Sequence, residues 1–177
     1  MNLNLNITRK TYYALGLLAA AASAAGAFGA LAGQAMSFLD SAAFALTGIM
    51  FLLLAAIKGS PKQQKGRYFA CFMLLILSSC FTGPVGRLLS ASYWPVFLWV
   101  ETLREDSAAA PAARLWPGTA ARTLTLCEAL ACLFWIAVSA GGLESLILFA
   151  NLFWLFTTLT RGWAALRLFR AAGQDAE

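Results

Sequence analysis

The stretch from Thr11 to Lys58 decides the fold of this chain: TYYALGLLAAAASAAGAFGALAGQAMSFLDSAAFALTGIMFLLLAAIK. It consists of two apolar segments separated at Gly33, and each is close to the twenty or so residues that a helix needs to cross a bilayer. We therefore predict transmembrane helices over 11–33 and 37–57, with a turn between them. A cleavable signal peptide is the alternative for the first segment, but this apolar run is long for one.

The composition of the whole chain is that of an integral membrane protein. Of its 177 residues, 60% are hydrophobic and 12% are charged, whereas soluble domains carry about 25% charged residues. The apolar residues form long runs and do not alternate with polar ones as in a water-facing helix or strand. We therefore predict the all-α fold class, as a polytopic helix bundle in the inner membrane.

The charge balance indicates contact with lipid and makes several other partners unexpected. The net charge is +5 and the chain contains no histidine. In a membrane protein an excess of Lys and Arg sets the orientation and contacts anionic lipids at the inner face. No basic run is interleaved with aromatic residues, so nucleic acid is not an expected partner. Because histidine is the commonest metal ligand and haem ligand, we expect no metal and no other cofactor.

The later apolar segments extend the first two into a bundle of six spans, arranged as three hairpins. The predicted spans are 11–33, 37–57, 68–83, 88–103, 122–140 and 143–160, with a cytoplasmic loop over 104–121 and a short amphipathic helix over 161–172 on the membrane surface. In an alternative with five spans, the third helix continues through Pro84 to Ser90. Six spans leave only Arg87 of the 13 Lys and Arg outside the cytoplasm, whereas five spans place more than half outside. Since basic loops stay in the cytoplasm, we prefer six spans with both termini cytoplasmic.

Small residues recur every four positions in the first predicted helix. Ala25, Gly29 and Gly33 form one row, and Ala22 and Gly26 belong to a second. Rows of this kind let another helix approach closely. We expect them to pack against helices of the same chain, and a dimer interface is the alternative.

Two polar residues within the last two predicted spans are candidates for a functional site. Glu128 lies six residues into the span over 122–140, and Asn151 lies near the middle of the span over 143–160. An ionisable residue at such a depth marks a functional site by default, so the pair could bind a cation, a proton or a polar substrate. In the alternative, Thr125 caps a helix that begins later, and Glu128 then lies at the membrane surface.

Three charged residues fall at the predicted outer turns. Arg87 is the only cation there, and Asp40 and Glu144 are the acids of the other two turns. We expect Arg87 to pair with one of these acids. An anion site formed by Arg87 and the first turn of its helix is the alternative.

The sequence contains no catalytic signature such as a P-loop, GxSxG or HExxH, and an enzyme is therefore not expected. The scarcity of polar residues inside the spans favours a structural or partner-binding subunit of a membrane complex. Its possible partners are another membrane protein or further copies of the same chain. The alternative is a small transporter or channel with a polar path near Glu128 and Asn151.

Overall fold

The computed structural model describes residues 2–34, 36–103 and 111–174, and the side chains of 9–34, 36–103 and 118–172. In this part the chain forms six α helices, one short 3-10 helix and no strand, which confirms the predicted all-α class. The helices are α1 (Asn2–Leu31), α2 (Ser37–Ala56), α3 (Lys62–Cys80), α4 (Gly83–Thr102), α5 (Pro111–Gly141), η1 (Glu144–Leu146) and α6 (Ile147–Gln174).

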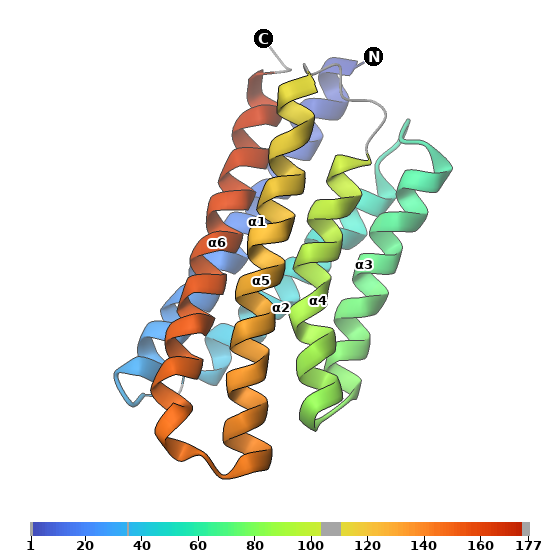
Figure 1. Cartoon of the computed structure of the whole chain (residues 1–177). Coiled ribbons are helices and arrows are strands. Elements are labelled where there is room, and N and C mark those ends of the chain that lie inside the picture. Colours follow the sequence, from blue (N-terminus) through green and yellow to red (C-terminus); the bar gives the residue numbers. More distant parts are fainter. Residues whose placement is uncertain (1, 35, 104–110, 175–177) are drawn as a thin grey trace.

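The six α helices stand side by side and run alternately in opposite directions (Figure 1). Each helix packs against its neighbours in the chain, and α6 packs along α1, so the helices close into a ring. The start of α1 and the end of α6 lie at the same end of the bundle, which we call the terminal end. The opposite end holds the connections α1–α2, α3–α4 and α5–α6, and we call it the turn end.

Glycine makes each of the three connections at the turn end possible. Gly33, Gly83 and Gly142 have φ angles of 75°, 68° and 63°. These values lie in the left-handed region, which glycine adopts readily because it lacks a Cβ. The separate helices α3 and α4 also show that the continuous helix of the five-span alternative is wrong.

Two segments outside the predicted spans are helical continuations of α5 and α6. Residues 111–121, predicted as part of a loop, form the first turns of α5; alanine is the best helix former and is abundant there. The rest of that predicted loop, 104–110, lies outside the described residues. The predicted surface helix over 161–172 is not separate either, because α6 continues to Gln174 and buries Ala164, Ala165 and Leu168 in the core.

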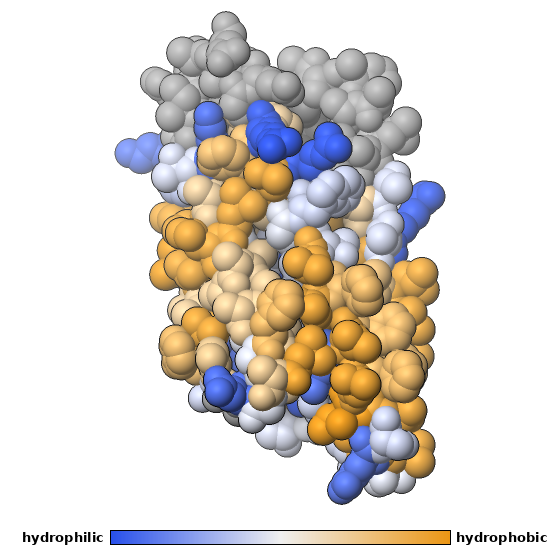
Figure 2. All heavy atoms as spheres, turned by 90° about the vertical axis from the view of Figure 1, so that its left-hand side faces the viewer, coloured by the Kyte–Doolittle hydropathy of each residue, from blue (hydrophilic) through white to orange (hydrophobic). Residues whose placement is uncertain are grey.

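Three helical segments are long and apolar enough to cross a membrane: Arg9–Leu31, Ser37–Ala56 and Gly118–Gly141. Two of the remaining helices are more polar, because α3 begins with a basic segment and α6 holds Arg161 near its middle. All six α helices nevertheless expose large apolar side chains. Figure 2 shows such side chains over the middle of one face, with hydrophilic residues gathered toward its ends. A contiguous apolar surface of this kind indicates contact with lipid or another protein.

An aromatic core fills the ring in the half nearest the terminal end. Phe97 of α4 lies at its centre, with ring centroids 5.1 Å from Phe51, 5.5 Å from Trp94 and 6.4 Å from Tyr68. These four side chains are buried, and aromatic pairs at such distances stabilise a core beyond the area that they bury. The terminal half of the bundle is therefore closed by packed side chains.

Two of the predicted small residues of α1 pack within the first hairpin. A Cβ at Gly26 would lie 2.9 Å from Oδ1 of Asp40, and one at Gly29 would lie 2.8 Å from the carbonyl oxygen of Gln34. These two glycines thus permit the close approach of α2 and of the turn before it. Ala22 is partly buried, and Ala25 is exposed.

Candidate functional site

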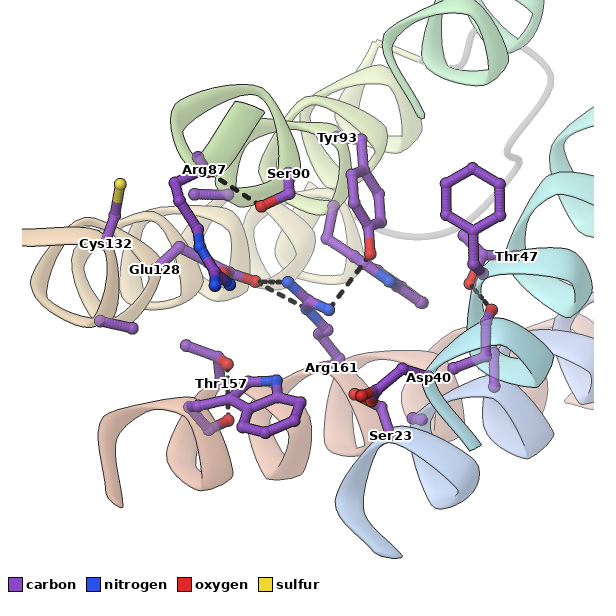
Figure 3. Close-up of a pocket in the computed structure, with 18 of the residues that line it drawn as sticks. Ser23, Asp40, Thr47, Arg87, Ser90, Tyr93, Glu128, Cys132, Thr157 and Arg161 are labelled. Atoms are coloured by element: carbon purple, nitrogen blue, oxygen red, sulfur yellow. Dashed lines mark hydrogen bonds and ion pairs between the residues drawn. The ribbon is translucent and has the colours of Figure 1, made fainter. Parts of the chain in front are cut away.

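A cavity of about 410 Å³ lies inside the ring, in the half nearest the turn end. Residues of α1, α2, α4, α5 and α6 line it, and no residue of α3 does. We call it the central cavity. Figure 3 shows charged side chains from α2, α4, α5 and α6 around this space.

A buried ion pair forms one wall of the central cavity. Nε of Arg161 donates a hydrogen bond of 2.6 Å to Oε1 of Glu128, and Nη2 of Arg161 contacts the same oxygen. Nη1 donates to the hydroxyl of Tyr93 at 3.3 Å. Glu128 is 5% exposed and Arg161 8% exposed. The two opposite charges, placed on α5 and α6, thus neutralise each other inside the bundle.

One oxygen of Glu128 remains available to the cavity. Every contact that Arg161 makes with this carboxylate goes to Oε1. In the part of the chain that the structure describes, no hydrogen bond reaches Oε2. A carboxylate can accept hydrogen bonds at both oxygens, so Oε2 can receive a proton, a cation or a hydrogen-bond donor from a bound solute.

The position of Glu128 within α5 contradicts the alternative in which Thr125 caps a helix that begins just before Glu128. α5 begins at Pro111, so Glu128 lies well inside the helix. The hydroxyl of Thr125 donates to the carbonyl oxygen of Ala121 at 2.6 Å, as a residue within a helix does. The alternative in which Thr125 caps the start of a helix is therefore wrong.

Arg161, and not Asn151, is the partner of Glu128. Asn151 is partly buried on α6 and does not line the cavity. Arg161 was not among the predicted site residues because the apolar run ends just before it, which predicts a position at the membrane surface. One signal was available: Ala164, Ala165 and Leu168 continue an apolar face beyond Arg161, as expected of a helix that does not end there.

Two further charges line the cavity where it reaches the protein surface. Asp40 of α2 and Arg87 of α4 are exposed and both line the cavity. The guanidinium carbon of Arg87 lies 4.8 Å from the ring centroid of Trp135, a cation–π contact. Among the described residues, Arg87 forms no ion pair with Asp40 or with Glu144, which is exposed and lies outside the cavity. The predicted pairing of Arg87 is therefore wrong.

Aromatic side chains form much of the remaining wall. Phe44, Trp94, Trp135 and Trp154 come from four different helices. Ligand sites in proteins are typically concave and largely apolar, with a few polar groups that orient the ligand. The central cavity has this composition and is large enough for a small organic molecule.

A second buried carboxylate lies toward the terminal end. Glu101 of α4 is 7% exposed and accepts hydrogen bonds from the hydroxyls of Tyr13, at 2.9 Å, and Tyr68, at 2.8 Å. These bonds join α1, α3 and α4 across the ring. Beside them, Nε2 of Gln64 donates to the carbonyl oxygen of Val100 at 3.5 Å. These hydrogen bonds link the helices at the terminal end of the bundle, beyond the aromatic core as seen from the cavity.

Replacing Tyr68 by Phe tests the contribution of this second cluster. We expect the free energy of unfolding to fall by about 1.5–3 kcal/mol, because a buried carboxylate loses a hydrogen bond. Denaturation of the purified protein in detergent measures the change. The matched control is Tyr12→Phe, since Tyr12 is only partly buried. Equal stability of the two variants would contradict the assignment.

The chemistry that the central cavity offers is binding by charge, hydrogen bonds and aromatic surface. Among the residues that the structure describes, no group of three or more His, Cys, Asp or Glu side chains could hold a metal ion. Comparison of the chain with protein-family models, with curated proteins and with solved structures finds no match.

Proposed function

We propose that this chain is a multi-pass inner-membrane protein whose central cavity binds a small organic solute in the course of transport. All six α helices would cross the bilayer as three hairpins. The apolar side chains exposed on every helix support this arrangement, since lipid would cover them. Both termini would lie in the cytoplasm, next to anionic lipids.

The charge distribution supports this orientation. The basic segment with Lys58, Lys62 and Lys65 lies at the terminal end, near the start of α1 with Lys10. Arg87 is the basic residue near the turn end. An excess of Lys and Arg marks the cytoplasmic side, so the turn end, and with it the opening of the cavity, would face outward.

One observation carries the proposal: the buried Glu128–Arg161 pair lines an open cavity. Ionisable residues inside a membrane protein are costly and usually mark a path for a substrate, an ion or a proton. A pair with a purely structural role would be expected to pack against other side chains on all sides. Here Oε2 of Glu128 remains free for a solute.

The aromatic core around Phe97 indicates from which side a solute would enter the central cavity. It closes the bundle between the central cavity and the terminal end, so a solute would enter the cavity from outside. Passage to the cytoplasm would require the helices to separate around this core. The structure would then correspond to the outward-open state of an alternating-access transporter.

Filling the cavity tests the proposed function without disturbing the ion pair. Ala43 of α2 lines the cavity, whereas Ala45 is exposed on the other side of the same helix. The purified protein is heated with millimolar amines, carboxylates or amino acids. We expect at least one class to raise the melting temperature of the native protein and of Ala45→Phe, because a ligand that binds only the folded state stabilises it.

The variant Ala43→Phe should lose this stabilisation, because its ring would occupy the site. An equal ligand-induced shift in Ala43→Phe and Ala45→Phe would contradict the proposal, as would the absence of any shift in the native protein. For a compound that binds, exchange across proteoliposomes then measures transport.

A structural or partner-binding role stays a prediction. Gly26 and Gly29 contact α2 and the turn of the same chain, so they support packing within one chain. A partner that co-purifies in mild detergent would favour this second role.

A further inference from the structure

The rim of the central cavity carries two opposite charges that do not neutralise each other. Asp40 projects from α2 and Arg87 from α4, and in the view of Figure 3 they lie on either side of the Glu128–Arg161 pair. Both side chains line the cavity, and no ion pair joins them within the described part of the chain. The cavity thus presents a negative and a positive group on different walls.

The charges deeper in the cavity are already neutralised. Arg161 is held by Glu128 and by the hydroxyl of Tyr93. Among the described residues that line the cavity, a bound solute would therefore meet one anion without an ion pair, Asp40, and one such cation, Arg87. Oε2 of Glu128 adds an acceptor for a hydrogen-bond donor of the solute.

Arg87 also contacts an aromatic neighbour. Its guanidinium carbon lies 4.8 Å from the ring centroid of Trp135, which lines the same cavity. Guanidinium groups stack on aromatic faces while their N–H groups still bind carboxylate or phosphate. This contact leaves the edge of the guanidinium able to hold an anion.

We propose that the central cavity binds a zwitterionic solute, with its ammonium group at Asp40 and its carboxylate or phosphate at Arg87. A solute with only a negative charge would be repelled by Asp40, and one with only a positive charge would be repelled by Arg87. Specificity of this kind depends on such repulsion as much as on attraction. The aromatic walls would hold an apolar part of the solute beside the two charged groups. This inference rests on the proposed function, because it names the class of solute.

Three compounds of similar shape test the inference. Phenylalanine carries both charges, phenethylamine only the positive one and phenylpropionate only the negative one. We expect phenylalanine to bind the purified full-length protein at least about tenfold more tightly than the other two, because each charge-assisted hydrogen bond is worth that much or more. Isothermal titration in detergent measures the three affinities.

Substitutions at the rim should change which compound binds. Asp40→Asn removes the repulsion of anions, so phenylpropionate should gain affinity while phenylalanine loses about tenfold. Arg87→Gln should correspondingly favour phenethylamine. The control is Glu144→Gln, an exposed acid near the turn end that lies outside the cavity, and it should leave all three affinities unchanged.

The same charge pair occurs in free amino acids and in the headgroup of phosphatidylethanolamine. Nanodiscs made with phosphatidylethanolamine or with phosphatidylglycerol distinguish the two sources. A free solute predicts the same phenylalanine affinity in both lipids. If the headgroup occupies the zwitterion site, phenylalanine should bind more weakly in phosphatidylethanolamine than in phosphatidylglycerol. Its affinity should then recover as phosphatidylethanolamine is diluted with phosphatidylglycerol.

The outcomes separate this inference from the proposed function. If all three compounds bind equally and Ala43→Phe abolishes their binding, the zwitterion inference is wrong but the solute-binding cavity stands. If Asp40→Asn and Arg87→Gln bind the three compounds as the native protein does, the inference is also wrong. If none of the three compounds binds the native protein, the zwitterion inference is wrong, and the melting-temperature test with the wider set of solutes decides the proposed function separately.

Discussion

Replacing Arg161 by Met is expected to lower the free energy of unfolding by about 3–5 kcal/mol, because it leaves Glu128 as an uncompensated charge inside the bundle. The native pair has short contacts between Arg161 and Oε1 of Glu128, and both residues are buried. Methionine fills much of the volume of the lost side chain but supplies neither charge nor donor. Denaturation in detergent, followed by intrinsic tryptophan fluorescence, measures the loss.

A second substitution separates the buried charge from the lost packing. In the double variant Glu128→Leu/Arg161→Met no charge is left unpaired, and we expect most of the lost stability to return, since apolar replacement of a buried pair is often neutral. The control Arg170→Met, at an exposed position of the same helix, should change stability by less than about 0.5 kcal/mol. A double variant as unstable as Arg161→Met would show that the pair does not neutralise itself as described.

Replacing Gly86 by Ala is expected to be the most damaging change of a single methyl group in the described part of the chain. A Cβ at this position would overlap the carbonyl oxygen of Phe81 and lie 2.8 Å from its carbonyl carbon. These atoms belong to the backbone between α3 and α4, so they cannot rotate away as a side chain can. We expect a loss of about 3 kcal/mol, at the upper end of the usual range for overpacking.

Gly66 provides the matched control for Gly86. It lies in α3, where an added Cβ would meet no atom within 4 Å. Alanine is favoured over glycine inside a helix by about 1 kcal/mol, so Gly66→Ala should be neutral or stabilising. Thermal unfolding of the two variants in the same detergent compares them. Similar melting temperatures would mean that α4 does not approach Phe81 as closely as the structure shows.

The sequence allowed the prediction of those features that depend on local physics. Long apolar runs predict helices, and glycines between them predict turns; Gly33, Gly83 and Gly142 adopt the positive φ that such turns use. The unusual position of Glu128 within an apolar segment also made it a candidate, and the structure buries it beside the central cavity. In each case the signal lies within a few residues of the feature.

The features that could not be predicted depend on which helices meet. Arg161 follows directly after an apolar run, and the local sequence does not show that the helix beyond it packs along α1 and is buried there. Arg87 was expected to pair with an acid at a neighbouring turn, but the ring arrangement brings Trp135 against it instead. Residues 111–121 contain alanine, which favours a helix, and also proline and glycine, which favour a loop. Their composition alone therefore does not predict that they form the start of α5.

Cysteine labelling at two adjacent positions of α5 shows whether a cavity open to water lies inside a membrane-embedded bundle. Cys132 lines the cavity and is 6% exposed, whereas Leu133 is 63% exposed on the outer face of the same helix. One protein keeps Cys132 alone, with Cys71, Cys80 and Cys127 replaced by Ala. The other lacks all four native cysteines and carries Leu133→Cys.

Both proteins are treated in intact membranes with a small charged thiol reagent that cannot cross the bilayer, applied from the side of the turn end. We predict that the reagent modifies Cys132 through the cavity and does not modify the Leu133→Cys protein, because lipid covers that face. Modification of the Leu133→Cys protein together with protection of Cys132 would contradict the account.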